Sequence, residues 1–399
     1  MTSDFLPTRT AALERLSRFL PQAGATYAAR RNFDLGAGRH SHVSTLSPYL
    51  RHRLITEAEV LQAVLARHSL RAAEKFVQEV YWRTYWKGWL EMRPAVWQDY
   101  LAERSAAWNA VQTQSGLRRR WEEACAGDTG IDAFDSWAQE LVETGYLHNH
   151  ARMWFASIWI FTLRLPWSLG ADFFLRHLLD GDVASNTLSW RWVAGLQTKG
   201  KTYLARASNI TQFTEGRFAP RGLAQEAPPL QGPDHPLLQA LPRPGEVAHD
   251  LRTGLLITPD DLSPGFIADA LADPVTVALT SHRTALSHLA IAPQVLAWED
   301  GALTETATRW ADRLGPITRA PDLVEWVRTH DLEQVVTAYA PVGVEADALR
   351  HLSTATDVRV TQLRRPYDSA AWPHASHGFF RFKEKIPELI GRLKGLTLA

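Results

Sequence analysis

A proline-rich stretch divides this sequence into two parts that must fold differently. Residues 224–249 contain six prolines: Pro228, Pro229, Pro233, Pro236, Pro242 and Pro244. Proline fixes φ and lacks the backbone N–H, so this density excludes a helix or a central strand. The stretch therefore predicts a linker or long surface loop at residues 223–249, between a domain at residues 1–222 and a second domain at residues 250–399.

Before the linker, apolar residues recur at three- and four-residue steps among charged ones. The pattern covers residues 57–90, 140–165 and 171–179, and strand signals are almost absent before residue 220. This period is that of amphipathic helices, so the first domain is predicted to be nearly all helical.

After the linker, short β-rich runs alternate with helical runs. Strands are predicted at residues 275–280, 294–299, 334–341 and 357–363, with helices at residues 304–314, 322–330 and 345–352. Such alternation predicts a small parallel α/β domain. The predicted fold is thus a helical domain followed by an α/β domain.

Tryptophan is concentrated in the first domain. The chain has 16 tryptophans, and 12 of them lie between Trp82 and Trp192. Density alone favours a helical core with large side chains. The other interpretation is a stacking or electron-carrying role around an aromatic ligand.

Composition excludes several classes of protein. Basic and acidic residues both number 43, which excludes a polybasic tail or an acidic disordered chain, although residues 1–222 carry 27 basic against 21 acidic side chains and so permit a polyanionic partner. The single Cys125 excludes a disulfide framework and all-cysteine metal sites. The N-terminus lacks a signal-peptide pattern and no apolar window reaches 18 residues, which predicts a cytoplasmic protein without membrane contact.

Two helical motifs bring charged and aromatic side chains together. Glu79, Trp82 and Arg83 share one helix face by their spacing, although for this triplet alone an exposed salt-bridging face with Trp82 in the core is the better explanation. His148 and His150 are two residues apart and do not share a helix face, so no zinc site is expected there.

Arg152 stands at the head of an apolar run that must be buried. A buried guanidinium is costly without a carboxylate, and Asp180 in the Asp-Gly-Asp turn at residues 180–182 is the candidate partner. Two separate surface charges are the alternative. After that turn, Asn186 and Trp190 share a helix side.

Near the N-terminus, Tyr27, Arg30 and Arg31 precede a hydroxyl-rich segment at residues 44–49. Cations and hydroxyls before a helix suit a phosphate or diphosphate, but helix capping explains the hydroxyls too. The common glycine-rich phosphate loops and the hydrolase elbow are absent from the sequence.

Taken in order, these segments resemble the FAD-binding helical domain of the DNA photolyase/cryptochrome family. The resemblance runs from Tyr27 to about Phe213 in six segments in register. They are residues 44–50, 79–83, 129–130, 144–149 with 152–153, 180–182 with Asn186, and 190–192.

The resemblance implies a folded FAD and assigns residues to it. Its ribityl-diphosphate part would be held by Tyr27, Ser44, Leu46, Ser47 and Arg83. Arg152 and Asp180 would form a salt bridge beside the isoalloxazine ring, with Asp182 near it and Asn186 facing N5. Trp190 and Trp167 fall on the first two members of the family's electron-transfer chain, and Trp108 and Trp159 are candidates for the third.

The resemblance also implies a lesion-binding set above the adenine: Glu79, Trp82, Asn149, Met153 and Trp192. The function expected from it is light-driven repair of pyrimidine dimers in DNA, of the cyclobutane type, by an electron from reduced FAD. A cryptochrome-like blue-light photoreceptor without repair activity is the alternative.

The sequence departs from the family pattern in three ways. His150 stands where the repair enzymes have arginine, and Val43 replaces a hydroxyl residue. The usual N-terminal antenna domain is expected to be missing. The α/β domain after the linker is either a rearranged antenna-like domain or an unrelated module.

Overall fold

The computed structural model describes residues 5–271 and 273–393, and the part before the proline-rich stretch is helical. Residues 5–222 contain no strand, which confirms the prediction for the described part of this region. We call residues 5–223 the helical unit. Its helices are α1 (Arg9–Phe19), η1 (Leu20–Gln22), α2 (Ala25–Arg30), α3 (Ser47–Arg51), α4 (Glu57–Leu65), α5 (Leu70–Glu91), α6 (Ala95–Thr113), α7 (Ser115–Ala126), α8 (Asp132–Thr144), α9 (Asn149–Ser157), the π-helical η2 (Ile158–Thr162), α10 (Trp167–His177), α11 (Val183–Val193) and α12 (Ala207–Phe213).

Local signals divide the long predicted helical stretches. A Thr56–Glu59 capping box starts α4, and the Ser69 side chain caps α5, so residues 57–90 form two helices. Gly145 ends α8 with φ +70°, and a Cβ there would lie 2.7 Å from Leu179 Cγ, so only glycine fits. The helical stretch predicted at residues 140–165 is therefore interrupted between α8 and α9.

The α/β unit, residues 253–363, is built on one parallel sheet. Its strands are β1 (Thr253–Ile257), β2 (Thr276–Leu279), β3 (Ile317–Arg319), β4 (Gln334–Ala338) and β5 (Arg359–Leu363), in the order β3-β2-β1-β4-β5. Every residue of the central strands β1 and β4 is buried, as expected where helices cover both faces. The strands predicted at residues 275–280, 334–341 and 357–363 are confirmed, whereas β1 and β3 were not predicted.

The predicted strand at residues 294–299 is wrong. These residues form the start of a helix, which Pro293 opens at its first position, where its missing N–H costs nothing. Buried Val295, Trp298 and Ala302 recur at helical steps, so the apolar run is one face of a helix. The helices of this unit are α13 (Gly265–Ala268), η3 (Arg283–Leu286), α14 (Pro293–Leu314), α15 (Leu323–Thr329) and α16 (Val344–Ala355).

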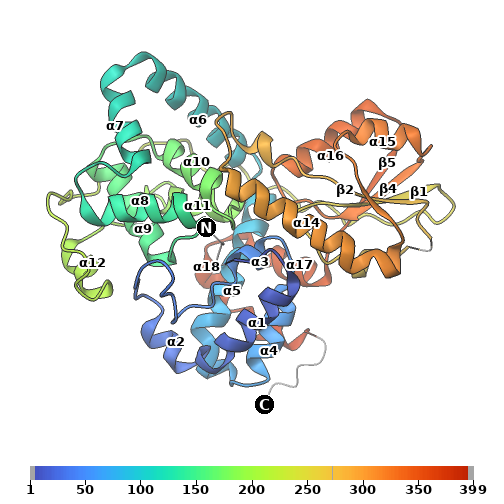
Figure 1. Ribbon diagram of the computed structural model, residues 1–399, viewed down its shortest axis with the longest axis horizontal. Helices are drawn as coiled ribbons and strands as arrows, with labels where there is room; N and C mark the ends of the chain where they lie inside the picture. The colour runs from blue at the N-terminus through green and yellow to red at the C-terminus, as the bar shows by residue number, and fades with distance from the viewer. Residues whose placement is uncertain (1–4, 272, 394–399) are drawn as a thin grey trace.

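After β5 the chain returns to the helical unit (Figure 1). The C-terminal helices are α17 (Pro366–Ala371), η4 (Trp372–Ser376), α18 (Phe379–Lys383) and α19 (Ile386–Gly391). The first three pack against α5, where Gly88 lets the Trp372 ring approach. A Cβ on Gly88 would lie 2.9 Å from that ring. The domain boundaries at residues 222 and 250 stay predictions.

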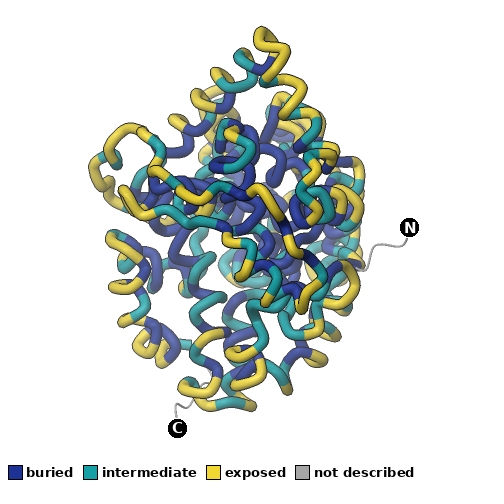
Figure 2. The backbone as a smooth tube through the Cα atoms, turned by 90° about the vertical axis from the view of Figure 1, so that its left-hand side faces the viewer, coloured by how far each residue is buried: buried dark blue, intermediate teal, exposed yellow. Residues whose placement is uncertain are grey.

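The two units meet at the carboxyl ends of the strands. From β1 the chain adds β2 and β3 on one side and then β4 and β5 on the other, and the loops after β1 and β4 lie against the helical unit. Ligand sites and contacts concentrate at this edge in open parallel sheets. Figure 2 shows that the buried backbone fills the interior of the helical unit, while its outward turns are exposed.

The proline-rich stretch contains no helix or strand. Two backbone bonds attach it to the helical unit: Leu230 N–H donates to Ala194 O at 3.0 Å, and Gln239 N–H donates to Met92 O at 2.9 Å. Across the described residues, no helix combines the length and apolar character needed to span a membrane.

Candidate cofactor and substrate site

The centre of the site is the turn between α10 and α11, residues 178–182. Gly181 N–H donates to Leu178 O at 3.1 Å, and Leu179 N–H donates to Gly145 O at 2.9 Å. Asp182 then caps α11 by accepting from Ser185 N–H at 2.7 Å. The turn thus presents two buried carboxylates, Asp180 and Asp182, in fixed positions.

The predicted ion pair between Arg152 and Asp180 is present. Arg152 Nη2 lies 3.0 Å from Asp180 Oδ2, and Arg152 Nε donates to Leu147 O at 2.9 Å. Asp180 is buried, whereas the Arg152 side chain keeps 22% of its surface. Burial opposes ionisation of Asp180, but the charges of Arg152 and Arg83 hold the pKa of this carboxyl below its usual value.

Asp182 faces the opposite way, toward the α/β unit. Lys87 Nζ lies 3.7 Å and Arg51 Nε 3.8 Å from its Oδ2 atom. Burial again opposes the charge, but Lys87, Arg51 and Arg83 hold the pKa of Asp182 well below the usual range. Both carboxylates are therefore ionised at neutral pH.

Arg83, on α5, has one buried N–H donor that no acceptor in the described part of the protein satisfies. Its charge acts on both Asp180 and Asp182, yet its buried Nη1 atom has no hydrogen-bond acceptor in the described structure. A buried donor left unsatisfied is costly, and a guanidinium is the side chain best suited to phosphate. Arg83, which is predicted to hold the diphosphate, thus has a free donor for a phosphate oxygen. This side chain is therefore suited to bind FAD.

The hydroxyl segment before α3 has a strained backbone. Thr45 has φ +50°, which is unusual for a β-branched residue, and its Oγ1 accepts from Arg15 Nη1 at 2.9 Å. Leu46 is fully buried, and Ser44 Oγ accepts from Leu46 N–H at 3.4 Å. Local strain of this kind clusters at ligand sites. Thr45 lies within the hydroxyl-rich segment predicted from the sequence, but only the fold reveals its φ.

Ser47 and Tyr27 flank that segment. The Ser47 hydroxyl contributes to holding the pKa of Asp180 below its usual value. Burial raises the pKa of Tyr27, whose ring packs against Phe19 and Phe76. These two predicted cofactor residues thus come from different helices, α3 and α2.

Asn186 is buried on the first half of α11. Its Nδ2 donates to Ala171 O on α10 at 2.9 Å, which fixes the amide. With the nitrogen engaged, the carbonyl oxygen is the atom suited to accept from a ligand N–H. This is consistent with the role that the resemblance implies for it.

The predicted lesion set is divided among three helices, of which α11 packs against the other two. Glu79 and Trp82 lie on α5, Asn149 and Met153 on α9, and Trp192 on α11. Asn149 is exposed, and Met153 and Trp192 are half-buried. No described contact joins the three groups directly.

Glu79 is already paired within the protein. Its carboxylate forms an ion pair with Arg31, just after α2. Burial raises the pKa of Glu79, and the Arg31 charge opposes that rise. Arg31 was predicted only as a phosphate cation, so its pairing with Glu79 is a finding of the structure.

Trp82 has one indole face covered by the C-terminal helices. Its ring stacks on Phe379 with centroids 3.5 Å apart and an interplanar angle of 11°. Trp192 stacks on Tyr203 at 5.7 Å and 29°. His150 is occupied too, since its ring stacks on Trp154 at 3.9 Å and its Nδ1 lies 3.0 Å from Asn32 O.

The predicted electron-transfer tryptophans are both buried. Trp190 packs edge-to-face on Trp159 at 6.2 Å and fills the space over Gly170, where a Cβ would lie 2.3 Å from its ring. Trp167 lies beside Tyr100 at 5.6 Å. Trp159 is fully buried, whereas Trp108 is half-buried against Trp121, so these third-member candidates sit in different surroundings.

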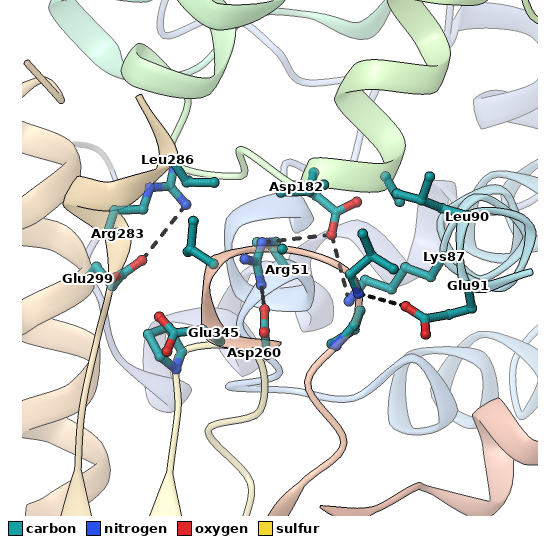
Figure 3. A pocket seen from close by; sticks show the side chains of 17 residues that line it. Arg51, Lys87, Leu90, Glu91, Asp182, Asp260, Arg283, Leu286, Glu299 and Glu345 are labelled. Atoms are coloured by element: carbon teal, nitrogen blue, oxygen red, sulfur yellow. Dashed lines mark hydrogen bonds and ion pairs between the residues drawn. The ribbon is translucent and has the colours of Figure 1, made fainter. Parts of the chain in front are cut away.

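A small charged cavity lies beside Asp182 where the two units meet (Figure 3). It measures about 20 Å³ and is lined by Arg51, Lys87 and Asp182 from the helical unit and Asp260, Arg283 and Glu345 from the α/β unit. This is room for about one water molecule. A flavin ring does not fit in this cavity.

Comparison with known proteins finds relatives of the helical unit. Residues 76–222 match the family described as the FAD binding domain of DNA photolyase. A deoxyribodipyrimidine photo-lyase of Synechococcus is 31% identical over 52% of this chain and 43% of its own length. One of Thermus thermophilus is 33% identical over 62% of this chain and 58% of its own. The chain spans about half the length of these curated relatives.

Two solved structures are among those that resemble part of this chain. A class III photolyase of Agrobacterium tumefaciens is 26% identical, with a TM-score of 0.41, over 52% of this chain and 43% of that chain. A cryptochrome of Synechocystis is 23% identical, with a TM-score of 0.42, over 52% and 43%.

Proposed function

We propose that this chain, whose residues 76–222 match the FAD binding domain of DNA photolyase, repairs pyrimidine dimers in DNA with reduced FAD and light. Bound FAD would supply an electron to the dimer and recover it after the bonds split, so no net oxidation takes place. The protein residues supply binding, orientation and electrostatics.

The observation that carries the proposal is the arrangement of charge around the turn. Arg152 pairs with Asp180 at 3.0 Å, and Arg83 beside it has a buried donor without an acceptor. An ion pair suits the edge of a polar ring system, and the free Nη1 donor of Arg83 suits a diphosphate. Side chains with both properties lie around one turn, at the positions that the resemblance assigns.

The roles of the lesion residues follow from their chemistry. Trp82 and Trp192 offer indole surfaces, and stacking of a base on such a ring contributes about 1–3 kcal/mol. Glu79 has a raised pKa and a cation, Arg31, beside it, so its carboxyl is suited to hydrogen bonding with a base edge. We assign these residues to the flipped dimer.

Loss of repair without loss of flavin tests this proposal. Trp82→Ala should lower dimer repair about tenfold or more, by the stacking energy of one base, while leaving FAD bound. Glu79→Gln should lower repair through a weaker hydrogen bond to the base edge and should also leave FAD bound. Trp310→Ala, a half-buried tryptophan on α14, is the matched control and should repair normally. Repair at the wild-type rate in both site variants would overturn the lesion assignment, and a wild-type protein without flavin absorbance would overturn the whole proposal.

The second candidate function is a blue-light photoreceptor without repair activity. The stacking of Phe379 on Trp82 favours it, because this contact occupies an indole face that a dimer would use. Illumination of the reduced protein with a dimer-containing oligonucleotide separates the two. Loss of dimer supports repair, and unchanged dimer with a light-dependent flavin spectrum supports the receptor.

A further inference from the structure

One buried arginine of the α/β unit holds the turn that carries both carboxylates. Arg283, the first residue of η3, donates from Nη1 to Gly181 O at 3.1 Å. Its Nη2 donates to Leu178 O at 3.1 Å and to Leu175 O at 3.2 Å. These carbonyls belong to the last turn of α10 and the loop after it, where helix carbonyls lack partners of their own. The Arg283 side chain is only 3% exposed.

The close approach of Arg283 to the turn requires a glycine at position 181. A Cβ on Gly181 would lie 2.7 Å from Arg283 Nη2, so a side chain at this position would displace the guanidinium. On its other side, Arg283 Nη1 lies 3.8 Å from Glu299 Oε2 on α14. The guanidinium therefore joins α14 of the α/β unit to the turn of the helical unit.

Gly181 O also accepts from a second buried guanidinium. Arg51 Nε donates to it at 3.2 Å, while Arg51 Nη1 donates to Asp260 Oδ1, after β1, at 2.6 Å. The same backbone oxygen is thus fixed from both units. Asp180 and Asp182 are the neighbours of that residue on either side, so their positions depend on these contacts.

We propose that Arg283 is a positioning residue for the flavin site, through which the α/β unit sets the placement of Asp180 against Arg152. The proposal rests on the FAD site proposed above. A planar guanidinium satisfies several acceptors at once in a fixed geometry, which a lysine ammonium does not reproduce. A positive charge at the C-terminal end of α10 is also favourable to the helix dipole.

Loosening the turn has a defined electrostatic consequence. Arg152 is held separately by Leu147 O, so it stays in place when Asp180 moves away. Its charge is then less compensated beside the ring, which favours the negatively charged reduced flavin. The midpoint potential of bound FAD should therefore rise.

The experiment compares Arg283→Lys and Arg283→Met with Tyr339→Phe in the full chain. Tyr339 OH donates to Glu91 Oε2 at 2.5 Å across the same interface but does not touch the turn, so its variant is a matched control. Amide hydrogen exchange of residues 175–182 is measured in all variants, together with FAD affinity and midpoint potential. Arg283→Lys provides a second variant that keeps a charge opposite Glu299 if Arg283→Met folds poorly.

In both Arg283 variants the amide hydrogens of residues 175–182 should exchange at least about tenfold faster than in wild type. Tyr339→Phe should leave the exchange rate of this segment unchanged. The potential should rise by about 30 mV, which corresponds to a tenfold change in the ratio of oxidised to reduced flavin for two electrons. Unchanged exchange and potential in both Arg283 variants would overturn the inference. Equal changes in Tyr339→Phe would overturn it too, since the effect would then be general loosening of the interface. A wild-type protein that binds no FAD fails the proposed function, yet the exchange measurement still decides the role of Arg283 in the turn.

Discussion

The later half of the chain meets the helical unit at two interfaces of opposite chemistry. The charged interface joins Arg51 and Arg53 to Asp260, Asp261 and Asp368, all buried. The aromatic interface joins Tyr81, Trp82 and Tyr85 of α5 to Phe379 and Phe382 of α18. The first lies next to the proposed flavin carboxylates, and the second covers a proposed lesion residue.

The contrast shows what each chemistry contributes. Buried ion pairs fix direction and distance but add little net stability, because both charges lose their hydration. Aromatic contacts contribute more through buried area and tolerate several ring geometries. The charged interface is therefore suited to fixing the turn that carries Asp180 and Asp182. The aromatic interface is suited to a contact on Trp82 that another ring can replace.

The largest effect is expected from breaking the charged interface. Arg53→Met leaves the carboxylates of Glu57, Asp261 and Asp368 without their shared buried cation. Removing one partner of a buried pair costs about 3–5 kcal/mol, so the urea midpoint should fall steeply. Arg118→Met breaks an exposed pair with Glu122 on α7 and should cost about 0.5 kcal/mol or less. Equal losses in the two variants would contradict the contrast.

Phe382→Ala tests the aromatic interface in the same way. Phe382 is fully buried against Tyr81 and Tyr85, and such a truncation costs about 3–4 kcal/mol from lost transfer energy and the cavity left behind. The neighbouring Phe380 is 82% exposed, so Phe380→Ala should stay within about 0.5 kcal/mol of wild type. Thermal or urea unfolding measures both, and a small loss for Phe382→Ala would show that α18 is only loosely attached.

A pH titration of stability separates the interfaces further, because the titratable Glu91 lines the same cavity as Arg51 and Asp260 of the charged interface. Burial raises the pKa of Glu91 to about 7, although Tyr339 OH and Val342 N–H donate to its carboxyl at 2.5 and 2.6 Å. Between pH of about 4.5 and 7 the folded chain keeps a proton that the unfolded chain has lost. The free energy of unfolding should therefore fall by about 1.4 kcal/mol per pH unit as pH rises through this window.

Glu91→Gln should remove that slope, which is measured as the difference between wild type and variant in urea unfolding at several pH values. Glu143→Gln, an exposed position on α8, should run parallel to wild type. Parallel curves for Glu91→Gln and wild type would show that Glu91 ionises normally in the folded protein.

The smallest expected effect concerns the cover on Trp82. If Phe379 occupies the face that a base would use, Phe379→Ala should tighten binding of a dimer-containing oligonucleotide about fivefold, near the lower end of the energy of one stacked base. The dissociation constant is measured at one fixed salt concentration, with Phe380→Ala as control. Weaker binding would place Phe379 behind Trp82 as a support for its ring.

Part of the fold and of the site was predictable because the signals are local. Helical periodicity identified the first part of the chain, and the proline-rich stretch has neither helix nor strand. The Arg152–Asp180 pair was predictable because a guanidinium at the head of an apolar run needs a carboxylate. The prediction of a strand at residues 294–299 was wrong because a short apolar run does not distinguish a strand from a helix. Pro293 is compatible with the start of either element, so it did not settle the choice.

The sequence by itself thus determined the helical part, three of the five strands and the Arg152–Asp180 pair, since spacing along the chain and the cost of an unpaired charge act locally. Only the tertiary structure decided that Arg283 holds the turn at Gly181 and that Phe379 covers Trp82. Each of these contacts joins residues far apart in sequence, and no local pattern records which distant side chain satisfies a backbone carbonyl or an indole face.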